Sequence, residues 1–335
     1  MTPLELTTFD PNGIHQIYDQ WPQIASESYK SDLEKISCKK IDHVVFAGMG
    51  GSGAIGDLFS SILSKEKIHV SVVKGYLLPK TVDTNTLVVV TSVSGNSQET
   101  LTVLKSSMNT NCSLIAFSSG GKMEETCFEN KINYRKIDML HSPRASFVKY
   151  VYSILKILNP ILPISKIEVE QSIAQLEKTR NKISSKNLSY TNPALNLAKW
   201  ISGIPLIYYP HGLQSAAIRF KSSLQENAKI HAITEDIIEA CHNGIVAWEK
   251  ESNVQPILIQ GKDDYVKTKE RWNIIKKYFE ENNIDFREVE SSEGHIMTKL
   301  IALIYLLDYA SIYKAILTKT NPSPTKSINY IKKNI

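Results

Sequence analysis

The chain has 335 residues, of which 42% are hydrophobic and 22% charged, a composition that excludes the disordered and fibrous classes. At about 150 residues per domain, this length predicts two domains. The net charge is +5, and five lysines without any acidic residue lie in residues 314–335, so the rest of the chain is near neutral. This distribution argues against a nucleic-acid partner and favours a small anionic ligand.

Cysteines and histidines give no sign of a metal site. The four cysteines are scattered without a CxxC pair, and no two histidines have HxH or HxxxH spacing. The first residues are acidic where a signal peptide would be basic, and no apolar run reaches the roughly 20 residues that span a bilayer. We therefore expect reduced thiols, no metal, no membrane association and a cytoplasmic location.

The first half alternates short β-rich runs with helical stretches. Strands are expected at residues 43–50, 69–73, 86–95 and 112–121. Near-continuous apolar runs such as LVVV are typical of parallel strands covered by helices on both faces. Ligands of such sheets bind at the carboxyl ends of the strands.

The same rhythm returns after a charged helical segment at residues 165–187. Further strands are expected at residues 204–210, 229–234, 254–261 and 285–290, and helices at 265–282 and 297–317. The sequence therefore predicts an α/β protein of two similar units. We place an N-terminal domain at residues 1–152 and a C-terminal domain at residues 153–335.

A glycine-rich loop follows the first predicted strand. Four glycines, Gly48, Gly50, Gly51 and Gly53, stand within six residues before a helix, where free backbone N–H groups attract an anion. The loop also fits the dinucleotide pattern G-x-G-x-x-G. The next strand, however, is followed by Lys74 and not by the acidic residue that holds a ribose, which disfavours NAD and leaves NADP open.

A second loop, rich in hydroxyls, follows the strand at 86–95. Ser92, Ser94 and Ser97 surround Gly95 where a strand meets a helix. These hydroxyls could cap the helix, or they could donate to a phosphate. Because two such loops follow strands of one sheet, we predict a phosphate pocket, whereas a dinucleotide would need only the first loop.

Five short motifs occur in order: GMGGSG (48–53), SVSGNSQET (92–100), PRASF (143–147), LQENAK (224–229) and HN (242–243). Together they resemble the bifunctional phosphoglucose/phosphomannose isomerases, a family built from sugar isomerase (SIS) domains. The resemblance implies two SIS-type domains with flavodoxin-like parallel sheets and a homodimer with a shared active site. It also implies isomerisation of glucose 6-phosphate, and in many members mannose 6-phosphate, to fructose 6-phosphate through a cis-enediol, without metal or cofactor.

The resemblance implies a role for each matching residue. The sugar phosphate would be held by Gly50, Gly51, Ser52, Ser92, Ser94 and Ser97. Arg144 would stabilise the enediolate, and Glu226 would carry the proton between C1 and C2. From the residues alone, Glu226 could equally belong to a solvated helix face beside Lys221 and Lys229.

Three further positions match residues near the sugar ring. His242, usually supplied by the partner subunit, would assist ring opening, although a lone histidine can also simply end a helix. Thr325 matches a threonine linked to mannose acceptance, and Lys332, with Lys333 adjacent, matches a lysine at the ring oxygen.

The chain departs from the family pattern at two positions. Ser97 replaces a threonine and keeps the hydroxyl, whereas Gly244 replaces the acid of an HNE motif and removes support for His242. Two other classes of function stay open. One is a non-catalytic SIS-domain sensor of sugar phosphates, which would not need Glu226, and the other is an NADP-dependent reductase built on the glycine loop.

Overall fold

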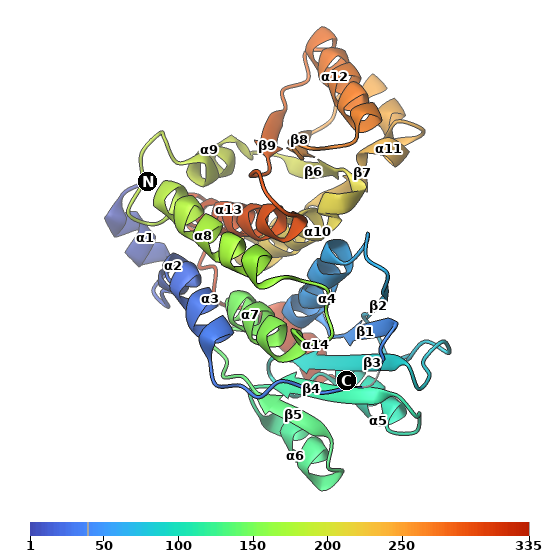
Figure 1. Ribbon diagram of the computed structural model, residues 1–335. Coiled ribbons are helices and arrows are strands. Elements are labelled where there is room, and N and C mark those ends of the chain that lie inside the picture. Colours follow the sequence, from blue (N-terminus) through green and yellow to red (C-terminus); the bar gives the residue numbers. More distant parts are fainter. Residues whose placement is uncertain (39, 335) are drawn as a thin grey trace. The chain divides into compact units, whose positions relative to one another are not determined.

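The computed structural model describes residues 1–38 and 40–334 (Figure 1). The chain has an α/β fold with two parallel β-sheets, each in its own compact unit. We call Gln20–Ile173 the N-terminal unit, and Met1–Asp19 together with Ala174–Ile335 the C-terminal unit. The predicted alternation of strands and helices in two similar halves is therefore present.

The division between the units differs from the predicted domain boundary at 152/153. That position lies inside α7 (Phe147–Leu158), and most of this helix is buried. Helix α7 packs against α3 (Trp21–Lys30), where the rings of Trp21 and Phe147 stack with centroids 6.2 Å apart. The whole of α7 therefore belongs to the N-terminal unit. The chain passes into the C-terminal unit inside α8 (Lys166–Ile183).

The sheet of the N-terminal unit has the strand order β2-β1-β3-β4-β5, which is the flavodoxin-like order. All its pairings are parallel. The strands are β1 (His43–Ala47), β2 (His69–Val73), β3 (Thr86–Ser92), β4 (Ser113–Ser118) and β5 (Asn133–Lys136). The order reverses between β1 and β3, the point at which ligands bind in such sheets.

Helices cover both faces of this sheet (Figure 1). Helices α4 (Gly50–Ile62) and α7 lie on one face, and α5 (Gln98–Ser107) and α6 (Gly121–Glu129) on the other. On the first face Phe46 stacks on Phe59 with ring centroids 4.9 Å apart. On the second, Val88 packs in one core cluster with Val103 and Met123. The central strands β1 and β3 are buried throughout, as their apolar runs predict.

The sheet of the C-terminal unit is smaller and has the order β7-β6-β8-β9, again all parallel. Its strands are β6 (Ile204–Tyr209), β7 (Ile233–Asp236), β8 (Val254–Gln260) and β9 (Arg287–Glu290). Strand β7 begins later than the predicted strand at 229–234. The reason is local: Lys229 has a φ of 59°, in the left-handed region, and ends a preceding helical turn.

Several helices accompany this sheet in the C-terminal unit. They are α1 (Pro3–Phe9), α2 (Ile14–Asp19), α9 (Pro193–Trp200), α10 (Gln214–Ser223), α11 (Ile237–Ala240), α12 (Val266–Glu281), α13 (Ile296–Leu317) and α14 (Lys326–Lys333), with short turns at His211–Leu213, Leu224–Ala228 and Gly244–Glu249. Figure 1 shows α11 and α12 on one face and α10 and α13 on the other. Leu258 packs with Trp272 and Phe279 under α12.

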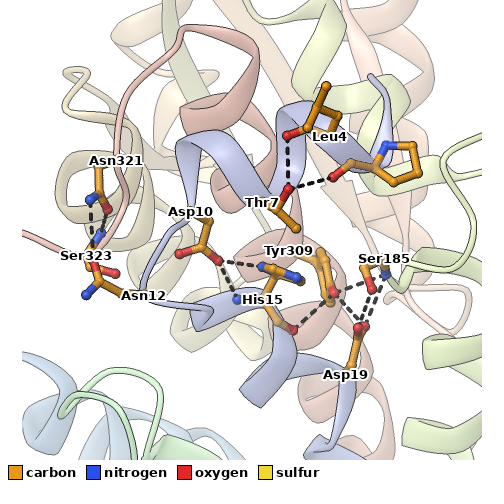
Figure 2. A network of polar contacts seen from close by, with 11 residues as sticks. Leu4, Thr7, Asp10, Asn12, His15, Asp19, Ser185, Tyr309, Asn321 and Ser323 are labelled. Atoms are coloured by element: carbon orange, nitrogen blue, oxygen red, sulfur yellow. Dashed lines mark hydrogen bonds and ion pairs between the residues drawn. The ribbon is translucent and has the colours of Figure 1, made fainter.

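Residues 1–19 are fastened to the C-terminal unit by buried polar contacts (Figure 2). The Tyr309 hydroxyl on α13 donates to Asp19 Oδ1 at 2.5 Å, and the backbone N–H of Ser185 donates to the same oxygen at 3.1 Å. Asp10 accepts from the backbone N–H of His15 at 2.9 Å and lies 2.6 Å from its Nδ1. The contacts of Asp19 with Ser185 and Tyr309 explain why the first helices belong with the second half of the chain.

Helix α13 is the one described helix that is long and apolar enough to cross a membrane. Within the structure, 83% of its most apolar 18-residue window is buried. It contacts α9 and α10 along its length. This burial is typical of a core helix.

Candidate active site

The glycine-rich loop joins β1 to α4 at the switch point of the first sheet. Gly50 has a φ of +52°, and a Cβ at Gly53 would stand 2.8 Å from the carbonyl oxygen of Gly48. Side chains would therefore prevent this close backbone path. The first N–H groups of α4 point out of the loop as at any helix start, which suits an anion.

The serine loop after β3 is joined to the glycine loop by a direct hydrogen bond. The backbone N–H of Val93 donates to Ser52 Oγ at 3.2 Å. Ser92 Oγ donates to Ser97 Oγ at 3.3 Å, and Ser94 Oγ accepts from the N–H of Asn96 at 3.3 Å. The structure thus brings Ser52, Ser92 and Ser97 into one cluster.

Ser97 stands at the N-cap of α5, yet its side chain makes no capping hydrogen bond. The capping interpretation of this serine is therefore not what the structure shows. Thr100, in the first turn of the same helix, is 1% exposed, and its hydroxyl has no hydrogen-bond partner among the described residues. Sequence reasoning missed Thr100, although its place in the SVSGNSQET motif was the available signal.

Arg144 lies beside the glycine loop. It occupies a turn that precedes α7 and is 6% exposed. A Cβ at Gly51 would stand 3.3 Å from the carbonyl oxygen of Pro143 and 3.4 Å from Arg144 Cα. The backbone that carries this arginine therefore touches the loop, so the N-terminal unit unites glycines, hydroxyls and a cation at one edge.

Lys74, which left an NADP interpretation open, forms an ion pair with Asp57 on α4. Its positive charge is thus engaged with a carboxylate of its own unit.

Glu226 lies in the C-terminal unit, in a single π-helical turn, Leu224–Ala228, that continues α10. Such turns are rare and often occur at functional sites. The turn is held by a contact with α13: Asn227 is fully buried and donates to Ser311 Oγ at 2.8 Å. Glu226 itself is half-buried, so it is not on a solvated helix face.

A buried polar network under α10 holds this segment. Arg219 donates to Asp308 Oδ2 through Nε at 3.0 Å and through a terminal nitrogen at 2.6 Å. Ser223 donates to the other oxygen of Asp308 at 2.6 Å. Burial opposes the charge of Arg219, but Asp308 more than offsets this and raises the pKa of the guanidinium. Sequence reasoning missed this network because its members are far apart in the chain.

A cavity of about 550 Å³ opens beside the π-helical turn. Glu226, Lys229 and Thr325 line it together with residues of the segment before α14. The ammonium of Lys229 donates to the carbonyl oxygen of Glu226 and, at 3.3 Å, to that of Pro322. The structure therefore places two predicted site residues, Glu226 and Thr325, on one cavity, and Lys229 joins the turn of Glu226 to the segment before α14.

Two other predicted residues lie elsewhere in the C-terminal unit. His242 is exposed after α11, and Lys332 is exposed on α14. Neither lines the cavity beside Glu226 as far as the described residues show. A Cβ at Gly244 would overlap the carboxylate of Glu235, so any side chain at this position needs that carboxylate to move. Burial raises the pKa of Glu235, and Glu239 adds to this shift.

In residues 1–38 and 40–334, no three His, Cys, Asp or Glu side chains are grouped so as to hold a metal ion. The N-terminal unit instead carries a glycine loop and serine hydroxyls beside Arg144, a combination suited to an anion. The C-terminal unit carries the carboxylate of Glu226 in a cavity.

Known proteins resemble this chain over most of its length. Residues 190–335 match the model of the bacterial phospho-glucose isomerase C-terminal SIS domain. Along 326 residues, 93% of this chain and 95% of the relative, the chain is 29% identical to a bifunctional phosphoglucose/phosphomannose isomerase of Caldicellulosiruptor bescii. The chain is a relative of the bifunctional phosphoglucose/phosphomannose isomerases.

The chain is also similar to other phosphosugar proteins. A D-glucosamine-6-phosphate 4-epimerase of Sulfolobus acidocaldarius is 27% identical over 72% of this chain and 76% of its own length. The solved structure of a glucose-6-phosphate isomerase like protein from Thermus thermophilus covers 99% of both chains with a TM-score of 0.64 and 14% identity. The fold is thus that of SIS-domain phosphosugar proteins, and the resemblance read from the motifs to the bifunctional isomerases is confirmed.

Proposed function

We propose that this protein is an aldose–ketose isomerase that interconverts glucose 6-phosphate, and also mannose 6-phosphate, with fructose 6-phosphate through a cis-enediol. The observation that carries the proposal is similarity over 93% of the chain to a bifunctional phosphoglucose/phosphomannose isomerase. No cofactor or metal is needed, because a single positioned base can move a proton between neighbouring carbons.

The N-terminal unit binds the phosphate of the sugar. Backbone N–H groups at Gly50 and Gly51 and the hydroxyls of Ser52, Ser92, Ser94 and Ser97 are the donors. This assignment is supported by the hydrogen bond between the two loops. It is also supported by Ser97, whose hydroxyl stands at the N-cap of α5 without making a capping hydrogen bond. Arg144, whose backbone touches Gly51, supplies positive charge to the developing enediolate.

In the C-terminal unit Glu226 is the base. Its carboxylate takes the proton from one of the two carbons C1 and C2 of the open-chain sugar and returns it to the other. The cavity and the rigid π-helical turn support this role, because a base must be held within hydrogen-bond reach of the proton it removes. Thr325, on the same cavity, contacts the sugar and permits use of mannose 6-phosphate.

Ring opening needs an acid or base near the ring oxygen, and we assign it to His242 and Lys332. Because His242 is exposed and stands away from the cavity of Glu226 in its own chain, we propose that it enters the site of a second copy. The functional molecule is then a homodimer with shared active sites. Each unit acts as a SIS-type domain with a flavodoxin-like sheet, and the four free cysteines suit a cytoplasmic location.

Substitution of the proposed base tests the assignment. Glu226→Gln removes the carboxylate and keeps the shape, so we expect kcat to fall by about 10²–10⁴-fold. Fructose 6-phosphate should still raise the melting temperature of the variant, because the phosphate donors are unchanged. Glu280→Gln, at an exposed position of α12, is the matched control and should retain full activity.

Full activity of the Glu226→Gln variant would overturn the assignment of the base. A wild-type protein that binds fructose 6-phosphate without forming either aldose would instead be a sugar-phosphate sensor. The half-buried place of Glu226 in a cavity disfavours the sensor, which has no need of such a carboxylate.

A further inference from the structure

A second cavity, of about 260 Å³, lies in the C-terminal unit away from Glu226. It is found at the carboxyl ends of β8 and β9, where Lys262 follows one strand and Ser291 and Ser292 follow the other. The strands are neighbours, since Gln260 pairs with Glu290 and the N–H of Ser291 donates to the Gln260 carbonyl at 2.8 Å. This is the edge at which parallel sheets bind ligands.

One face of α8 forms the opposite wall. Gln175, Thr179 and Lys182 line the cavity, and their spacing of four and three residues places them on one side of a helix. The amide of Gln175 donates to the hydroxyl of the buried Thr179 at 3.4 Å. Leu303 and Leu306 of α13 add an apolar surface, so the cavity combines polar groups with an apolar wall.

The hydroxyl of Ser292 is an independent sign of a ligand. Its oxygen is buried and has no hydrogen-bond partner among the described residues. The neighbouring Ser291 is 2% exposed and donates to the Ser292 carbonyl at 3.2 Å, which fixes the turn. Because an unsatisfied buried hydroxyl costs free energy, an oxygen atom of a bound molecule would stabilise this turn.

The charges in the cavity favour an anion that also carries hydroxyl groups. The lining includes two basic residues, Lys182 and Lys262, and one acidic residue, Glu290, all of them exposed at its rim. Lys262 pairs with Glu293 at 3.1 Å, but the side chains are 45% and 79% exposed, so the pair is weak and an anion can replace Glu293. Glu290 and Gln175 offer oxygen acceptors for hydroxyl groups of the same molecule.

We propose that this cavity binds a small phosphorylated polyol, with the phosphate held by Lys182, Lys262 and Ser292. Its volume suits a molecule of a few carbon atoms. The site is separate from the phosphate loops of the N-terminal unit and from the cavity of Glu226, and it does not depend on the isomerase activity.

Glycerol 3-phosphate is the probe, titrated calorimetrically into the full chain. We expect Lys182→Met with Lys262→Met to weaken binding by about tenfold or more, since both phosphate cations are lost while the side-chain stems remain. Glu290→Gln should strengthen binding, because it removes the one acidic group of the lining. Lys178→Met with Lys277→Met, exposed lysines outside the cavity, should change nothing.

The same titration on Ser94→Ala with Ser97→Ala separates this site from the proposed phosphate loops. Heat that persists in the serine variant and disappears in the lysine variant supports the proposal. Heat that is lost only in the serine variant means that glycerol 3-phosphate binds at the loops alone, and that result overturns it. Absence of binding at millimolar concentration overturns it as well.

Discussion

Lys229 is the residue whose geometry links the proposed base to the C-terminal segment. Its ammonium reaches the carbonyl oxygens of Glu226 and Pro322, while its own backbone holds a φ of 59° that side chains rarely adopt. Neither contact involves the carboxylate of Glu226. We propose that Lys229 is a positioning residue, which holds the backbone of the proposed base in place beside the cavity.

Lys229→Met removes this link and keeps most of the side chain. We expect kcat for fructose 6-phosphate to fall by about 10–100-fold, because a small misplacement of a catalytic group is costly. The KM should change little, since the proposed phosphate donors are unchanged in this variant. Lys131→Met is the control, because Lys131 is also a left-handed lysine, with a φ of 54°, but exposed in the N-terminal unit. A variant that changes only KM would show that Lys229 contacts substrate.

Asp10 and His15 predict how stability depends on pH (Figure 2). Burial alone would raise the pKa of Asp10, but hydrogen bonds from His15 outweigh it and hold the pKa below 3.8. Because the pKa of Asp10 is lower in the folded than in the unfolded state, its ionised carboxylate stabilises the protein at pH values above 3.8. This contribution is lost as the pH falls through the folded-state pKa. Asp10→Asn should thus lower the unfolding free energy by about 1–3 kcal/mol at neutral pH.

Urea unfolding of both proteins between neutral and acidic pH measures this difference. The difference should narrow as the pH falls from 3.8, the ordinary pKa of an aspartate, through the lower pKa that Asp10 has in the folded protein. A difference that stays constant over the whole range would mean that the hydrogen bonds of Asp10 do not depend on its charge.

At the scale of elements, the serine loop depends on one glycine. Gly95 has a φ of +70°, and a Cβ at this position would stand 1.7 Å from the carbonyl oxygen of Gly120. The backbones of the loop after β3 and the loop after β4 are therefore in contact at Gly95 and Gly120. A side chain at Gly95 would prevent this contact. Ser94 and Ser97 belong to the same loop, so this backbone contact helps to fix their positions.

Gly95→Ala should lower the unfolding free energy by about 2–4 kcal/mol through steric overlap and backbone strain. It should also raise the KM for fructose 6-phosphate, because the serine hydroxyls shift. Gly75→Ala, where a Cβ meets open space, is the control and should change stability by less than about 0.5 kcal/mol. Chemical denaturation with steady-state kinetics checks both effects, and equal stability of the two variants would contradict this role of Gly95.

Most elements could be predicted from the sequence because the pattern that defines them is local. Helices α12 and α13 lie within one residue of their predicted bounds, and β1 and β3 carry the apolar runs of buried strands. Strand β5, Asn133–Lys136, has no apolar run and is partly exposed at a sheet edge, so no strand was expected there. The π-helical turn at Glu226 was equally hidden, because contacts with α13 determine it.

The candidate site divides along the same line. The loops of Ser52 and Ser97 were predictable because short motifs mark them in the chain. Lys229 and the pair of Arg219 with Asp308 were not, since their partners are distant in sequence and only the fold brings them together. The assignment of residues 1–19 to the C-terminal unit has the same cause, as Asp19 meets Ser185 and Tyr309.

At the scale of the whole molecule, a shared active site predicts complementation between inactive variants. Each site would combine Glu226 of one chain with His242 of the other. Glu226→Gln and His242→Ala homodimers should both be inactive, whereas mixed dimers regain one intact site of two. Random mixing of equal amounts then restores about a quarter of wild-type activity. If His242 serves its own chain, mixing restores nothing, and the shared site is disproved.

Conversion of fructose 6-phosphate by the purified protein in excess EDTA, with glucose 6-phosphate and mannose 6-phosphate measured separately, decides whether the protein is a metal-independent isomerase. We predict that both products form and that their rates do not depend on the chelator. Absence of both products, while fructose 6-phosphate still raises the melting temperature, would contradict the isomerase and leave a sugar-phosphate binding protein.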